Sequence, residues 1–81
     1  MLVVEMNKLN KLRKKIDKID REIIQLLCRR VKISKNISYV KMKEKLAIVD
    51  EARERNILKR AGRFKKIFKA IIQYSRKVQR V

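Results

Sequence analysis

The sequence predicts an all-α fold, and three observations lead to this class. The 81 residues include one Gly and no Pro, so few positions would interrupt a helix. Hydrophobic residues make up 46% and charged residues 41% of the chain, which is typical of long amphipathic helices. Apolar side chains recur at alternating spacings of three and four residues, the period of one helix face. We predict a single domain over residues 1–81, with one long helix and two shorter ones.

The long helix is predicted from about Glu5 to about Lys45, after a poorly specified start over residues 1–6. Its apolar stripe occupies the a and d positions of a helix that packs on a partner along its length. The stripe consists of Leu9, Leu12, Ile16, Ile19, Ile23, Leu26, Arg30, Ile33, Ile37 and Val40. Arg30 is the charged member, and a guanidinium on a packed seam is costly unless it reaches solvent or meets an anion.

A second row of residues beside the stripe ends in Ser34, Ser38 and Lys41. The small serines would leave space beside the helix. Lys41 follows Arg30 by eleven residues, so the two cations share a face at a separation of about 16 Å. They either grip one small dianion between them or are two solvated surface cations, and the spacing alone leaves both interpretations open.

The second helix is predicted from about Asp50 to Ala61, after a connection over Leu46–Val49. Asp50 is the expected N-cap, and Glu51 adds negative charge to the first turn. Arg53 and Glu54 extend the inner face of this helix toward its start. They form either a solvated pair or a polar pocket wall in which Glu54 accepts a hydrogen bond from a ligand hydroxyl.

Gly62 is expected to end the second helix as a left-handed cap. The third helix follows over about Arg63 to Gln79, and its apolar face consists of Phe64, Phe68, Ile71 and Ile72. The same spacing continues to Ser75 and Gln79, so the face becomes polar toward the end of the helix. Either these residues reach solvent, or they line a site.

The two later helices together would span about 45 Å, whereas the first would span roughly 60 Å. Part of the stripe therefore needs a second chain to cover it. An intertwined helical homodimer, with the long helices antiparallel or crossing, meets this need.

The net charge of +17 calls for an anionic partner. Nucleic acid and a small polyanionic metabolite both fit, but the cations are spread around the helices and only two Tyr and two Phe are available for stacking bases. The sequence has no His, so it lacks the usual proton shuttle and metal ligand. The apolar start Met1–Val4 is too short for a signal peptide or a membrane span, and we expect a cytoplasmic protein.

These features together resemble the all-helical (AroQ-class) chorismate mutases from Leu12 to Gln79. Leu12–Asp20 is similar to the first-helix signature of that family, and an Ile-Ile-x-Leu-Leu segment and Arg30 follow. Lys41 lies at the family's spacing from Arg30. Asp50–Arg55 resembles the family's Asp-x-x-Arg-Glu-x motif, and Ser75 and Gln79 stand where its last helix carries polar ligands.

The resemblance implies a cofactor-free and metal-free Claisen rearrangement of chorismate to prephenate, in the shikimate pathway to Phe and Tyr. It assigns Arg30 to the side-chain carboxylate of the substrate. It assigns Arg13, shared across the dimer interface, to a carboxylate as well. Lys41 and Gln79 would donate to the ether oxygen, and Ser75 would bind the ring carboxylate.

The resemblance also implies that Glu54, with Arg53 and the backbone of Asp50, fixes the ring hydroxyl. Two features depart from the family pattern: the short link between the second and third helices, and Arg76 where an apolar residue is more usual. Two alternatives remain, an isochorismate-pyruvate lyase on the same scaffold and a basic nucleic-acid-binding helical protein. We expect neither nucleic acid nor a membrane as a partner.

Overall fold

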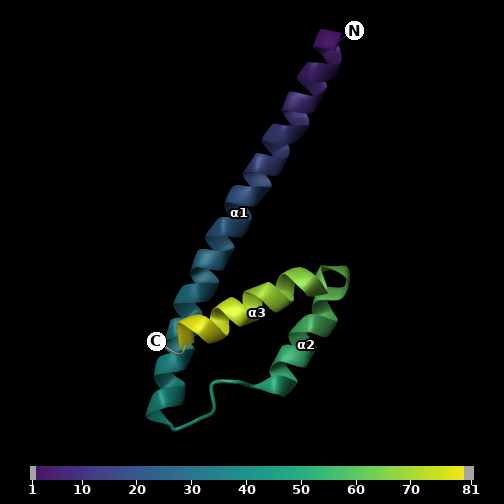
Figure 1. Cartoon of the computed structure of the whole chain (residues 1–81). Coiled ribbons are helices and arrows are strands. Elements are labelled where there is room, and N and C mark those ends of the chain that lie inside the picture. The colour runs from purple at the N-terminus through teal and green to yellow at the C-terminus, as the bar shows by residue number, and fades with distance from the viewer. Residues whose placement is uncertain (1, 80–81) are drawn as a thin grey trace. The chain divides into compact units, whose positions relative to one another are not determined.

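A computed structural model describes residues 2–79 of the chain (Figure 1). The elements in order are α1 (Leu2–Lys43), α2 (Glu51–Ala61), a 3-10 turn η1 (Gly62–Phe64) and α3 (Lys65–Gln79). Residues 2–79 contain no strand, so the predicted all-α class is confirmed. No helix in this range is long and apolar enough to span a membrane.

The chain divides into two units, Met1–Arg30 and Val31–Val81. The boundary between them falls inside α1 rather than in a loop. The first unit, as far as it is described, consists of α1 alone. The second holds the last turns of α1 together with α2, η1 and α3. The prediction of one domain over residues 1–81 stays a prediction.

In the first unit, α1 begins at Leu2, so the expected poorly specified start was wrong for residues 2–6, and Met1 lies outside the described residues. The early start has a local reason, because this segment has no helix breaker and Glu5 lies in the first turn, where a negative charge is stabilising. The stripe is exposed here, with Leu12 at 57% and Ile16 at 58% of full accessibility. One helix by itself cannot cover its own apolar face.

In the second unit, α1 ends two residues before the predicted Lys45. Lys45 has a φ of 57°, and its N–H donates to the carbonyl of Met42 at 3.3 Å. The Leu46 N–H donates to the carbonyl of Lys41 at 2.7 Å. This pair of bonds is a Schellman motif, with a lysine at the left-handed position where glycine is usual.

The start of α2 agrees with the prediction. The Asp50 carboxylate accepts a hydrogen bond from the backbone N–H of Arg53 at 3.0 Å. The backbone N–H of Glu54 donates to the carbonyl of Asp50, also at 3.0 Å. Asp50 is therefore the N-cap, and its side chain satisfies one of the N–H groups that the first turn leaves unpaired.

The end of α2 differs from the prediction at Gly62. Its φ of 57° is positive, as expected, but its ψ is −121°, which is not the left-handed helical value. Gly62 instead opens η1, and the third helix begins at Lys65 rather than at Arg63. An added Cβ at Gly62 would meet no atom within 4 Å, so the backbone conformation alone calls for glycine here.

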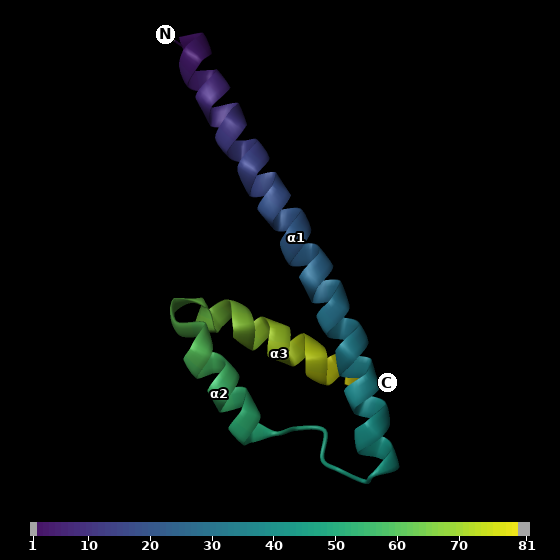
Figure 2. The same ribbon diagram turned by 180° about the vertical axis from the view of Figure 1, so that it is seen from behind.

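In the second unit, α3 runs back from η1 at an angle to α2 and ends beside the last turns of α1, as both views show (Figures 1 and 2). Among the described residues only Ile72 and Ser34 are buried, at 6% and 5% exposure. Several apolar residues of α2 and α3 are half-buried: Ile57, Leu58, Ala61, Phe68 and Ile71. The core of this unit is small, and it brings the polar end of α3 next to α1.

Candidate active site

Serine side chains link the end of α1 to the end of α3. The hydroxyls of Ser34 and Ser75 lie 3.5 Å apart, at the long limit of a hydrogen bond. The Ser38 hydroxyl donates to the backbone carbonyl of Gln79 at 2.8 Å. Ser34 and Ser38 are one helical turn apart, so they face α3 from the same side of α1. Small polar residues thus let the end of α3 approach α1 closely.

Lys41 lies on the same side of α1, one turn after Ser38. Its ammonium donates to the backbone carbonyl of Ile48 at 2.7 Å. The side chain is half-buried, so this bond fixes its direction. An ammonium has three donors, and two remain for a ligand or water.

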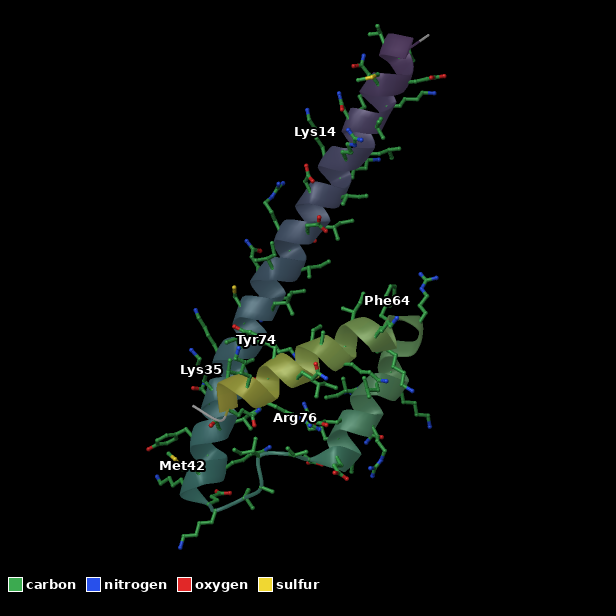
Figure 3. All side chains as sticks on the ribbon, in the orientation of Figure 1. Lys14, Lys35, Met42, Phe64, Tyr74 and Arg76 are labelled. Carbon is green, nitrogen blue, oxygen red and sulfur yellow. The ribbon has the colours of Figure 1, made fainter. Side chains whose placement is uncertain are left out.

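Glu54 on α2 faces Arg76 on α3, whose side chain points toward α2 (Figure 3). Arg76 Nε donates to Glu54 Oε2 at 2.8 Å, and its terminal NH2 group donates to Glu54 Oε1. This is a bidentate, charge-assisted pair. The hydrogen bonds from Arg76 hold the pKa of Glu54 below its ordinary value; burial opposes this effect and the positive charge of Lys41 adds to it.

Gln79 carries a polar atom with an unmet hydrogen-bonding capacity. Its Oε1 is buried and has no hydrogen-bond partner within residues 2–79. Rotating the terminal amide by half a turn exchanges its oxygen and nitrogen, so this position can present either an acceptor or a donor. A buried polar group without a protein partner is costly, and a bound ligand would satisfy it.

The structure brings four of the predicted site residues together in the second unit. Lys41, Glu54, Ser75 and Gln79 come from the end of α1, the start of α2 and the end of α3, and all are half-buried. They form a cluster with Ser34, Ser38 and Arg76, which we call the polar cluster.

The other predicted site residues have different settings. The Asp50 side chain caps α2, and the Arg53 side chain is exposed while its backbone N–H donates to that cap. Arg13 and Arg30 belong to the first unit. Arg13 is exposed and Arg30 is half-buried.

Two partners in the polar cluster were not predicted. Arg76 was noted as a departure from an apolar pattern, but its pairing with Glu54 was missed, because 22 residues separate them and no helical spacing connects them. The carbonyl of Ile48 was missed because every residue has one. An arginine that interrupts the apolar positions of α3 was the one signal in the sequence, since such a charge needs a partner.

The polar cluster combines cationic donors, hydroxyls, an amide and one carboxylate. Such a set can bind carboxylates and ether or hydroxyl oxygens of a small ligand through side chains alone. Within residues 2–79, no group of three or more metal-ligating side chains could hold a metal ion. The fold and the polar cluster together define a helical protein with the donor set of a small-anion site.

Comparison with known protein families identifies the family of this chain. Residues 12–66 match the family model for chorismate mutase type II. The matched segment is more than half of the chain, so the chain belongs to this family. It contains Arg13, Arg30, Lys41 and Glu54, whereas Ser75 and Gln79 lie beyond it.

Two curated relatives and one solved structure resemble the chain. It is 36% identical over 70 residues to the 3-dehydroquinate dehydratase of Pyrobaculum aerophilum, a match that covers 86% of this chain and 23% of that protein. It is 44% identical over 61 residues to the bifunctional chorismate mutase/prephenate dehydratase of Aquifex aeolicus, covering 75% of this chain and 17% of that protein. The chain thus spans less than a quarter of the length of these relatives.

A conserved hypothetical protein from Pyrococcus furiosus has a similar solved structure. Its TM-score to this chain is 0.88 and its sequence identity 46%. The match covers 89% of this chain and 95% of that one.

Proposed function

We propose that this chain is a chorismate mutase, which rearranges chorismate to prephenate without a cofactor or a covalent intermediate. The observation that carries the proposal is the convergence of Lys41, Glu54, Ser75 and Gln79 in the polar cluster of a chain that belongs to the chorismate mutase type II family. The name of the Aquifex aeolicus relative, a bifunctional chorismate mutase/prephenate dehydratase, also supports it.

The rearrangement breaks an ether bond and forms a carbon–carbon bond within one molecule, so no proton has to be transferred. Catalysis then consists of holding the substrate in its compact reactive conformer and stabilising the charge that develops on the ether oxygen. Lys41 has two spare donors and Gln79 an unsatisfied amide end, and these two groups would donate to that oxygen.

The remaining ligands would orient the substrate. Ser75 would bind the ring carboxylate, and Arg30 the side-chain carboxylate through its planar fork. Glu54, with Arg53 and the backbone of Asp50, would fix the ring hydroxyl.

The functional form in this proposal is an intertwined homodimer. The exposed stripe supports it, since Ile19 at 52% and Ile23 at 48% exposure are apolar residues that a partner helix would cover. Arg13 would then bind a carboxylate in the partner's site. We further propose that the protein acts in the cytoplasm, in the biosynthesis of Phe and Tyr.

A turnover assay with purified protein tests this function. Chorismate should disappear with equal formation of prephenate, followed by NMR, at a rate well above the uncatalysed reaction. Isochorismate, assayed in parallel, should not release pyruvate, because that reaction belongs to the alternative lyase. Tight, strongly salt-dependent binding of DNA or RNA without chorismate turnover would favour a nucleic-acid-binding protein instead.

A further inference from the structure

Arg76 and Glu54 form a more constrained pair than an ordinary surface ion pair. The two side chains join α2 to α3, and both N–H donors on the guanidinium edge that faces the carboxylate are used. The Glu54 side chain is only 19% exposed, whereas that of Arg76 is 37% exposed. A fork-to-fork pair fixes the plane of the carboxylate as well as its position.

We propose that Arg76 is a positioning residue that holds the Glu54 carboxylate in one orientation as an acceptor for the ring hydroxyl of the substrate. This role rests on the proposed function. A carboxylate has about four acceptor sites, and the guanidinium takes two of them. The remaining sites on Glu54 stay available to a hydroxyl, while the rotation of the carboxylate is blocked.

The charges around Glu54 support this role. Arg76 acts on the carboxylate from α3 and Lys41 from α1, and both hold its pKa below the ordinary value; Asp50, at the start of α2, opposes them. Glu54 in turn raises the pKa of Arg76, to which Glu51 also contributes. Glu54 therefore stays ionised, and able to accept a hydrogen bond from a hydroxyl, at a lower pH than a free glutamate would. Removing Arg76 takes away the largest of these effects.

The position of Arg76 in α3 also fits. It lies between the two predicted ligands Ser75 and Gln79, within one turn of both. One helix end thus carries two groups that contact the substrate and one that controls a third group on α2. A lysine here would keep the charge but lose the second parallel hydrogen bond.

The test compares the pH dependence of kcat/KM for chorismate in the wild type, Arg76→Gln and Arg76→Lys. In Arg76→Gln the acid limb of the profile should move to higher pH, because the active species is the ionised carboxylate and its pKa rises. KM should also rise, on the order of tenfold at neutral pH, with kcat changed less, because a hydroxyl contact is made in both the ground and transition states. Arg76→Lys should restore part of both changes.

Two controls make the result specific, and circular dichroism confirms that each variant is folded. Lys77→Gln removes a neighbouring charge on α3 and should leave the profile unchanged. Glu54→Gln has no carboxylate to titrate, so adding Arg76→Gln to it should produce no further shift of the acid limb.

If the wild type is active and its pH profile of kcat/KM superimposes on that of folded Arg76→Gln, the role of Arg76 is overturned but the proposed function is not. The same would follow if the shift persisted in the Glu54→Gln background. A wild type without chorismate turnover would instead overturn the proposed function, and this role with it.

Discussion

Both the side chain and the backbone of Lys41 form hydrogen bonds to the segment that follows α1. Its ammonium donates to the carbonyl of Ile48 at 2.7 Å, and its own carbonyl accepts the N–H of Leu46, also at 2.7 Å. The connection between α1 and α2 therefore orients the lysine to which we assign the ether oxygen. Such a preorganised donor needs little rearrangement when charge develops on the substrate.

Replacing Lys41 by Ala should lower kcat by about 10²–10³-fold, by analogy with the loss of one oxyanion donor. The matched control is Lys35→Ala, which removes an exposed lysine of the same helix and should change kcat less than twofold. Steady-state kinetics of both variants checks the prediction. A folded Lys41→Ala protein with less than a tenfold loss would assign the stabilisation of the ether oxygen to another group.

Replacing Lys45 by Gly should stabilise the protein. Lys45 has a φ of 57°, a left-handed conformation that costs a residue with a Cβ about 1–2 kcal/mol and glycine much less. The glycine variant should gain up to about 1 kcal/mol, since the added freedom of glycine in the unfolded chain offsets part of the relief. Urea denaturation measures the gain, with Lys35→Gly, at an exposed position inside α1, as a control that should lose stability. If both glycine variants lost the same free energy of unfolding, the conclusion that Lys45 is strained would be contradicted.

Replacing Gln79 by Glu should make the activity dependent on pH. An amide donates a hydrogen bond without titrating. Gln79 should therefore cause no decline in the kcat of the wild type between mildly acidic and neutral pH. In the variant, only the protonated carboxylic acid can donate to the ether oxygen, and kcat should fall as the pH rises through its pKa. Superimposable profiles for the two proteins would remove Gln79 from the reaction.

A charge placed on the stripe should break the proposed dimer. Ile23→Glu would bury a carboxylate at a helix–helix seam, and the dissociation constant should rise at least about 100-fold. Gln25→Glu adds the same charge beside the stripe and should leave the dimer intact. Analytical ultracentrifugation over a range of concentrations compares them. A wild type that sediments as a monomer at all concentrations would contradict the dimer itself.

Mixing two inactive variants tests whether Arg13 is shared between subunits. Arg13 and Arg30 lie seventeen residues apart on α1, which is about 25 Å along one helix, too far to clasp the same small molecule. Arg13→Ala and Arg30→Ala homodimers should each be nearly inactive. After joint refolding, about half of the dimers are mixed and each holds one intact site, so activity should return to roughly a quarter of the wild-type value. Mass spectrometry confirms the mixed dimers, and their presence without recovery would mean that Arg13 acts elsewhere or not at all.

The sequence by itself determined the three helices, both ends of α2 and the end of α3. A chain without Pro, with apolar residues at helical spacing, has few alternatives to helix, and Asp50 could be identified as a cap because capping depends on residues three positions apart. The predicted ligands on the polar ends of helix faces, Lys41, Ser75 and Gln79, also followed from spacing and family pattern. Helices, their caps and the polar ends of their faces depend on residues that lie close together in the sequence.

Only the tertiary structure decided which polar groups pair with one another. Arg76 meets Glu54 across 22 residues, and Ser38 meets the carbonyl of Gln79 across 41. Such pairs depend on the angle and distance between α3 and α2 and between α3 and the end of α1. The positive φ of Gly62 and the packing around Ile72 together determine this geometry. No spacing within a helix encodes that path, because the apolar packing that sets it is non-directional and is shared among many side chains.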